Sequence, residues 1–402
     1  MAIPKWCNLL TKIDRNKEGK FMIKVLSIFG TRPEAIKMAP VVKALDKNPN
    51  IESLVCVTAQ HREMLDQVLS LFEIIPDYDL DIMKSGQSLT QASSRMLLAL
   101  EPVLKECQPD LVLVHGDTST TLCGAQAAFY QQIPIGHVES GLRTYDIYSP
   151  WPEEANRQLT SIITKLHFAP TKAAAQHLYD EHNNPDYIYT TGNTVVDALL
   201  EVKNKLENNE ALRNELKLKF SELDFTKRRV LITGHRRENF GDGFESICQA
   251  IQELAQKYPD YEFVYPVHLN PNVKEPVNRL LKNLGNVKLI EPQDYLPFVY
   301  LMSTSHIILT DSGGIQEEAP SLGIPVLVMR STTERQEAVE AGTVKLVGTH
   351  APTIVAEVSS LIENEAIYLK MSQAHNPYGD GQASQRITET IVNFFSQEKI
   401  SK

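Results

Sequence analysis

Residues 308–327 read ILTDSGGIQEEAPSLGIPVL, and this stretch decides the fold class. An apolar run ends at Asp311, two glycines follow, and a helix start with Glu317 and Glu318 precedes the next apolar run. A strand, a glycine turn, a helix and a second strand are typical of a parallel sheet covered by helices. We expect the glycines to let backbone N–H groups approach a ligand, because helix N-termini favour phosphate.

The same alternation extends outward from this stretch along the chain. Short apolar runs, most of them bounded by Gly or Pro, predict twelve strands, at residues 24–29, 53–58, 111–115, 134–138, 166–169, 187–190, 230–233, 262–267, 287–290, 307–310, 326–329 and 345–347. Twelve strands are too many for one compact sheet. We therefore expect an α/β protein with two doubly wound, Rossmann-like domains.

A charged helical segment at residues 201–219 follows the expected domain boundary. We place the N-terminal domain at residues 22–192 and the C-terminal domain at residues 193–380, and we expect a last helix within residues 381–402 to pack back on the first domain. Residues 1–21 precede the first strand pattern and contain five basic and two acidic residues. We interpret them as a disordered leader.

The composition is that of a globular protein. Of 402 residues, 42% are hydrophobic and 22% are charged, and no apolar run approaches the ~18 residues that a transmembrane helix requires. The formal net charge of −10 becomes −13 without residues 1–21, because 35 basic and 48 acidic residues remain. This balance argues against nucleic-acid or membrane binding, but a local positive site can still bind a phosphate. The five cysteines form no C-x-x-C pair, and the D-x-D string at residues 79–81 lies in an apolar run, so we expect a reduced, cytoplasmic protein without a metal site.

Two segments are candidates for binding a phosphate-bearing ligand. In GTRPEAIKMAP, residues 30–40, Arg32 and Lys37 lie near a predicted helix start, although a solvated helix start is the alternative. The segment is neither a P-loop nor a G-x-G-x-x-G motif, so dinucleotide binding is not supported. Near the glycine turn, Gln293 and Phe298 are suited to reading and packing a base, and Arg335 adds a cation. This order predicts a nucleoside diphosphate held mainly by the second domain.

Carboxylates follow two strands of the first half. Asp117 comes directly after the strand at 111–115, although it could equally be the N-cap of the next helix. Glu139 follows the next strand, and Glu153 and Glu154 lie at a helix start, where the alternative role of acidic residues is to complement the helix dipole. If three carboxylates gathered around one crevice, their pKa values could be pushed apart, so that one acts as base and another as acid.

Histidines end several strands. His235 stands beside Arg236 at the end of a strand in the second half, which makes it a candidate for holding a proton at neutral pH. His268 occupies the matching position one strand later, and His115 and His137 end strands in the first half. We interpret the last three as mainly structural.

Nine motifs together resemble one family, the non-hydrolysing UDP-N-acetylglucosamine 2-epimerases of bacteria. The motifs are FGTRPEAIKMAP (29–40), TAQHREMLDQ (58–67), LVHGDT (113–118), GHVESGLRT (136–144), SPWPEEANR (149–157), TGHRRENFG (233–241), YPVHLNPNV (265–273), TDSGGIQEEAPSLGIPVLVMR (310–330) and TTERQEAVEAGT (332–343). The resemblance covers residues 22–402. It implies a glycosyltransferase-B architecture, in which two Rossmann-like domains face a central cleft that holds UDP, and a homodimer. It also implies interconversion of UDP-N-acetylglucosamine and UDP-N-acetylmannosamine for surface polysaccharides, and substrate activation at a second, adjacent site.

The resemblance also implies roles for individual residues. Asp117, Glu139 and Glu153 would be the acid and base carboxylates, and His235 would interact with the diphosphate or help its departure. The nucleotide contacts would be Arg32, Lys37, Gln293, Phe298, Ser312, Gly313, Gly314, Glu318 and Arg335. The second-site contacts would include Gln60, Gln87, Arg236 and His268.

The chemistry expected of such a site is an elimination. The C2 proton of the sugar is not acidic, because no carbonyl adjoins it, and the sequence shows no nicotinamide-binding motif. Loss of UDP and of the C2 proton would give 2-acetamidoglucal, to which UDP adds back. Three alternatives stay open: a hydrolysing epimerase that releases N-acetylmannosamine and UDP, a glycosyltransferase of the same fold, and a non-enzymatic nucleotide-sugar sensor.

Overall fold

The computed structural model describes residues 22–59, 62–84 and 86–400, which form two compact units. The first unit contains the described residues up to Ala198 and those from Gly379 onward, and the second runs from Leu199 to Tyr378. The leader expected at residues 1–21 lies outside the described residues. The division falls inside helix α7 (Thr194–Asn208).

The first unit is built on a seven-stranded parallel sheet in the order β3-β2-β1-β4-β5-β6-β7. Its strands are β1 (Ile23–Phe29), β2 (Ile51–Val57), β3 (Tyr78–Asp79), β4 (Leu111–His115), β5 (Ile135–Val138), β6 (Leu166–Ala169) and β7 (Ile188–Thr190). β4, with the sequence LVLVH, is buried at every position, as expected of a parallel strand covered on both faces.

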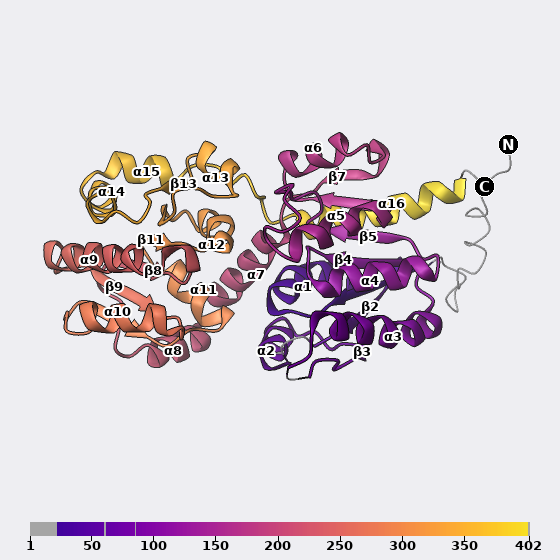
Figure 1. Cartoon of the computed structure of the whole chain (residues 1–402), viewed down its shortest axis with the longest axis horizontal. Helices are drawn as coiled ribbons and strands as arrows, with labels where there is room; N and C mark the ends of the chain where they lie inside the picture. The colour runs from indigo at the N-terminus through magenta and orange to yellow at the C-terminus, as the bar shows by residue number, and fades with distance from the viewer. Residues whose placement is uncertain (1–21, 60–61, 85, 401–402) are drawn as a thin grey trace. The chain divides into compact units, whose positions relative to one another are not determined.

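Helices pack on this sheet in two groups. They are α1 (Arg32–Asp46), α2 (Arg62–Phe72), α3 (Leu89–Cys107), α4 (Ser119–Tyr130), α5 (Glu153–Ile163), α6 (Lys172–Asp180), η2 (Pro185–Tyr187) and α16 (Ala383–Ile400). α1 packs against α2 and α16, whereas α4 packs against α3 and α5. The C-terminal helix α16, yellow in Figure 1, thus packs against α1, which lies near the N-terminal end of the sequence.

The second unit is a six-stranded parallel sheet in the order β10-β9-β8-β11-β12-β13. Its strands are β8 (Arg229–Thr233), β9 (Glu262–Pro266), β10 (Val287–Ile290), β11 (Ile307–Thr310), β12 (Val326–Val328) and β13 (Val344–Leu346). Its helices are α8 (Glu210–Lys219), η3 (Arg237–Asn239), α9 (Asp242–Lys257), α10 (Pro271–Leu281), α11 (Tyr295–Ser303), α12 (Gly313–Glu318), η4 (Ala319–Leu322), α13 (Gln336–Glu340), α14 (Ala351–Glu363) and α15 (Glu365–Ser372). α9 packs against α10 and α14, and these three helices share one apolar core with the strands.

Both sheets confirm the predicted α/β class of two Rossmann-like units. Each of the twelve predicted runs coincides with a strand, and the structure adds β3, a two-residue edge strand that pairs with Cys56 and Val57. In each sheet the strand order reverses between two adjacent strands, β1 and β4 in the first and β8 and β11 in the second. Ligands of doubly wound sheets bind beyond the carboxyl ends of strands at this switch point. None of the helices in the described ranges has the length and apolar character to cross a membrane.

Candidate functional site

Asp117 lies at the carboxyl end of β4, at the switch point of the first sheet. Gly116 turns the chain there with a φ of 67°, a left-handed conformation that suits glycine. The N-cap of α4 is Thr118, whose hydroxyl accepts the Thr121 N–H at 3.2 Å, so the Asp117 carboxylate does not cap the helix. Burial raises the pKa of Asp117 to about 6, although Arg157 Nη2, 3.4 Å from Oδ2, acts to lower it.

Glu139 follows β5, the next strand of the sheet, and lies in a network of polar side chains. Lys37 of α1 donates a hydrogen bond to its carboxylate, and Asn193 Nδ2 donates to Oε2 at 3.0 Å. His115 Nε2 lies 3.9 Å from the same oxygen, and burial lowers the pKa of His115 to about 4, so that this ring is neutral at pH 7. The Glu139 charge adds to burial in raising the pKa of Asp117. The two carboxylates therefore share one electrostatic environment.

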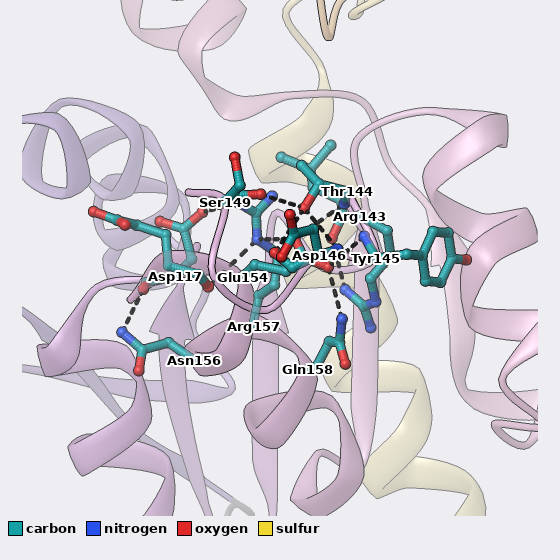
Figure 2. Close-up of polar contacts among 12 residues, drawn as sticks. Asp117, Arg143, Thr144, Tyr145, Asp146, Ser149, Glu154, Asn156, Arg157 and Gln158 are labelled. Carbon is teal, nitrogen blue, oxygen red and sulfur yellow. Dashed lines mark hydrogen bonds and ion pairs between the residues drawn. The ribbon is translucent and has the colours of Figure 1, made fainter. Parts of the chain in front are cut away.

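Helix α5 contributes the third predicted carboxylate and two residues that hold Asp117. Glu153 begins the helix, and its charge also adds to burial in raising the pKa of Asp117. Asn156 Nδ2 donates to the Asp117 carbonyl oxygen at 2.9 Å, and Arg157 pairs with its carboxylate (Figure 2). Helix α5 thus fixes both the backbone and the side chain of Asp117.

Glu154, beside Glu153 at the start of α5, has a structural role. Its side chain is fully buried, Oε2 accepts the Thr144 N–H and Oε1 accepts the Tyr145 N–H, both at 3.0 Å. Arg157 Nε lies 3.2 Å from Oε2. Figure 2 shows Glu154 between Arg157 and the turn at residues 144–149. This carboxylate holds the turn against the helix that carries the site.

Glu34 joins the first turns of α1 and α4. Its buried carboxylate accepts the Thr31 N–H at 2.8 Å through Oε2 and the Thr118 hydroxyl at 2.7 Å through Oε1. Arg32 directly follows the N-cap Thr31 and forms no hydrogen bond or ion pair within residues 22–59, 62–84 and 86–400. Glu34 thus connects the first turn of α1, which carries Arg32, to the segment that carries Asp117.

The switch point of the second sheet brings Asp311, which follows β11, to His235, which follows β8. The Asp311 side chain is fully buried, and Oδ2 accepts the His235 N–H at 2.9 Å and the Arg236 N–H at 2.8 Å. His235 Nδ1 lies 3.4 Å from Asp311 Oδ1, and its ring stacks on His268 with the ring centroids 5.7 Å apart. Burial lowers the pKa of His235 against the opposing effect of Asp311.

The glycine turn after β11 begins α12. Ser312 is the N-cap residue, and Gly313 and Gly314 are the first residues of the helix. A Cβ on Gly313 would lie 3.2 Å from Arg335 Cζ, and one on Gly314 would lie 3.6 Å from Glu318 Oε1. The missing side chain of Gly313 therefore lets Arg335 approach the backbone of the turn, whereas the distance at Gly314 is that of an ordinary van der Waals contact.

Arg335 is held beside this turn by two acidic residues. Its Nε donates to Glu317 Oε1 at 2.9 Å, and its Nη1 donates to Glu334 Oε1 at 2.6 Å. Burial acts to raise the pKa of Glu334, but Arg335 and Arg330 outweigh burial and hold it at about 2. Glu334 is therefore ionised at neutral pH, and the Arg335 guanidinium has a fixed position next to Gly313.

The residues predicted to contact a base and a ribose lie near α11. Gln293 precedes the helix, and its Nε2 donates to the Glu291 carbonyl oxygen at 2.7 Å. Phe298 is a half-buried residue of α11. Tyr295 OH donates to Glu318 Oε2 at 3.0 Å, which joins the start of α11 to the end of α12.

The four residues predicted for a second site come from different parts of the chain. Gln60 lies outside the described residues. Gln87 belongs to the first unit, where its Oε1 accepts from Arg95 Nη1 at 2.6 Å. Arg236 and His268 belong to the second unit, and both lie beside His235.

A sequence model of one family, described as UDP-N-acetylglucosamine 2-epimerase, matches residues 43–392 of this chain. The chain belongs to this epimerase family. A UDP-N-acetylglucosamine 2-epimerase of Yersinia pestis is 61% identical over 371 residues, which are 92% of this chain and 99% of that protein. Its counterpart in Escherichia coli K12 is also 61% identical over 371 residues, with the same coverage of both chains. The crystal structure of the Neisseria meningitidis enzyme bound to UDP-N-acetylglucosamine is similar, with a TM-score of 0.85, 57% identity, and coverage of 92% of this chain and 100% of that chain.

In this epimerase, four residues that contact the predicted site residues were not predicted from the sequence. Asn156 and Arg157 contact Asp117, Asn193 contacts Glu139, and Asp311 contacts His235. Helical spacing could have indicated the first two, because positions 153, 156 and 157 lie on one face of α5. For Asp311 the signal was its place directly after a buried strand, the same as that of Asp117.

Replacing Asp117 with Asn is expected to stabilise the fold at pH 8. A carboxyl whose pKa is raised on folding stabilises the fold below its unfolded-state pKa of about 3.9, and this contribution is lost as the pH rises through the folded-state value of about 6. The Asp117→Asn variant has no carboxyl group at this position to ionise. Its free energy of unfolding should therefore exceed that of the wild type by about 1–3 kcal/mol at pH 8. The difference should vanish near pH 4. Denaturant unfolding at both pH values measures it, and a variant less stable than the wild type at pH 8 would contradict the raised pKa.

Proposed function

We propose that this protein interconverts UDP-N-acetylglucosamine and UDP-N-acetylmannosamine by inverting C2 of the sugar. Membership of the family and relatives at 61% identity support the substrate. The observation that carries the proposal is the pair of strand-end carboxylates, because Asp117 has a pKa raised to about 6 and lies beside Glu139, which is bound to Lys37. A carboxyl that titrates near neutral pH can both give and take a proton.

The proposed reaction is an elimination followed by an addition. A base removes the C2 proton, the C–H electron pair forms the C1=C2 double bond of 2-acetamidoglucal, and the C1–O bond breaks so that UDP leaves with its electrons. A proton then returns to the opposite face of C2, and UDP adds back to C1. The atoms balance without water or a redox partner, so the reaction is of the non-hydrolysing type.

The first unit provides the proton-handling groups in this proposal. Asp117, Glu139 and Glu153 act at C2, where the two faces of the sugar require a separate acid and base. Lys37 and Asn193 hold the Glu139 carboxylate by hydrogen bonds to its Oε2 atom. These contacts keep the carboxylate oriented in a site where only a tenth of its side chain is exposed.

The second unit provides most of the nucleotide contacts in this proposal. The Arg335 guanidinium and the backbone N–H groups of the glycine turn stabilise the diphosphate, both bound and as it departs. His235 assists the departure. The nucleotide-binding residues are Arg32, Lys37, Gln293, Phe298, Ser312, Gly313, Gly314, Glu318 and Arg335.

We further propose finer features that follow from the family resemblance. The enzyme acts as a homodimer in the cytoplasm and supplies N-acetylmannosamine units for a surface polysaccharide. Substrate activates it through a second site that includes Gln60, Gln87, Arg236 and His268. Residues 22–192 with 381–402, and residues 193–380, serve as its N-terminal and UDP-binding domains.

Product analysis by NMR tests this function. Purified protein incubated with UDP-N-acetylglucosamine is expected to give UDP-N-acetylmannosamine, whose anomeric carbon remains bonded to the diphosphate. Free N-acetylmannosamine with UDP would instead show the hydrolysing reaction. Stable starting material would contradict the proposal and favour a glycosyltransferase that lacks its acceptor, or a sensor.

A further inference from the structure

One oxygen of a buried carboxylate in the second unit lacks a hydrogen-bond partner. Asp311 Oδ2 accepts three hydrogen bonds, from the backbone N–H groups of His235 and Arg236 and from Asn239 Nδ2 at 3.3 Å. Oδ1 is buried as well, and no donor among the described residues is hydrogen-bonded to it. Leaving a buried acceptor unsatisfied is costly, so this oxygen requires an explanation beyond bracing the turn.

The imidazole of His235 offers the missing donor. Its Nδ1 lies 3.4 Å from Asp311 Oδ1, and its own backbone N–H is bound to Oδ2 of the same carboxylate. The ring is stacked on that of His268 at an interplanar angle of 23°. Because the two ring nitrogens lie on different sides of the imidazole, Nε2 points away from Asp311. The ring is 44% exposed, so a ligand can reach it.

We infer that Asp311 is a positioning residue that keeps the proton of His235 on Nδ1 and so directs Nε2 at the departing diphosphate. The inferred role of His235 at the diphosphate rests on the proposed function, whereas the inferred position of its proton rests on the contact with Asp311. An ionised carboxylate only accepts hydrogen bonds, so a nitrogen facing it must be the protonated one. Hydrogen bonds of this kind are often long without substrate and tighten in the substrate complex.

The charges around His235 agree with this role. Burial lowers the pKa of the imidazole, Asp311 acts to raise it, and His268 and Arg236 act to lower it. Asp311 is therefore the group that stabilises an imidazolium at this position. The imidazolium, formed when Nε2 takes up a proton from solvent, transfers this proton to a diphosphate oxygen as the C1–O bond breaks and regains it when UDP adds back.

Asp311→Asn distinguishes positioning of the ring from bracing of the turn. Two backbone N–H groups and Asn239 donate to the Oδ2 position, so the amide oxygen of the variant must occupy it. The amide NH₂ group then takes the Oδ1 position and presents a donor to His235 Nδ1. The variant is therefore expected to move the neutral proton from Nδ1 to Nε2, and the pKa of His235 should fall because the stabilising negative charge is gone.

NMR of the full-length protein with ¹⁵N-labelled histidine reads the tautomer directly, with the His235 signals assigned through their loss in His235→Gln. The wild type should show the Nδ1–H form, and Asp311→Asn should show Nε2–H. Asn239→Ala is the matched control, because it removes a donor to Oδ2 without changing the carboxylate that faces the ring, and it should keep the wild-type tautomer. An Nε2–H wild type, or an unchanged tautomer in Asp311→Asn, would overturn the inference. The wild-type spectrum alone decides the matter if Asp311→Asn does not fold.

Kinetics test the consequence for turnover. Asp311→Asn is expected to lower kcat by about 10²-fold, the low end of what a general acid contributes, with a smaller change in KM. A loss confined to KM would contradict the positioning role. The tautomer is measured without substrate. An unexpected tautomer would therefore contradict the inferred role of Asp311 but not the proposed function. A negative product test would contradict the proposed function but not the assignment of the His235 proton.

Discussion

Asp117→Asn is expected to lower kcat for epimerisation by about 10²- to 10⁴-fold, the range over which general acid–base groups act. The amide has nearly the shape of the carboxyl group but no proton that it can exchange at neutral pH. The backbone support of the site should survive, because Asn156 binds the carbonyl oxygen of position 117 and Thr118 caps α4. NMR assays of product formation measure kcat, and circular dichroism checks the fold.

Glu154→Gln is the matched control for this experiment. Glu154 lies on the same helix that holds Asp117, but its carboxylate accepts the N–H groups of Thr144 and Tyr145 instead of facing the site. Its replacement should lower the free energy of unfolding by about 1–3 kcal/mol, since one oxygen acceptor is lost, and should reduce kcat far less than Asp117→Asn. A nearly normal kcat for Asp117→Asn would show that the strand-end aspartate is only structural.

Glu262→Ala is expected to destabilise the second unit by about 3–5 kcal/mol, because it leaves a buried guanidinium without its carboxylate. Arg229 Nη2 lies 2.9 Å from Glu262 Oε2, and only 1% and 3% of the two side chains are exposed. Arg229 begins β8, the strand that ends before His235, and its guanidinium also lies over the Phe225 ring, 4.7 Å from the centroid. Chemical denaturation followed by circular dichroism measures the loss.

Two further variants make the stability prediction specific. The double variant Arg229→Met with Glu262→Leu removes both charges and should recover most of the lost stability, since a buried ion pair can be replaced by apolar packing. Glu357→Ala breaks the exposed pair with Lys345 on the same unit and should cost at most about 1 kcal/mol. If Glu262→Ala cost no more than Glu357→Ala, the pair would not be buried as described.

The sheet cores were predictable because their strands are continuous apolar runs. The β4 sequence LVLVH and the stretch at 308–327 show a strand end, a turn and a helix start in sequence alone. β3 was not predicted, because two residues are too short for any periodicity. Its existence depends on pairing with Cys56 and Val57, which only the folded sheet brings next to Tyr78 and Asp79.

The site was predictable only in part, because neighbouring residues with similar propensities take different roles. Asp117 and Thr118 are both good N-cap residues, and only the backbone geometry assigns the cap to Thr118. Glu153 and Glu154 are adjacent acids at one helix start, yet only Glu154 is turned into the protein to bind backbone N–H groups. Asp311 was missed because the glycine turn after it dominated the interpretation of that segment.

Deuterium incorporation at C2 tests the proposed elimination most directly. UDP-N-acetylglucosamine is incubated with the enzyme in deuterium oxide, and the UDP-N-acetylmannosamine formed is analysed by NMR and mass spectrometry. Since one group removes the C2 proton and another delivers a proton to the opposite face, the product should carry one deuterium at C2. Epimerised product with its original hydrogen at C2 would contradict the mechanism.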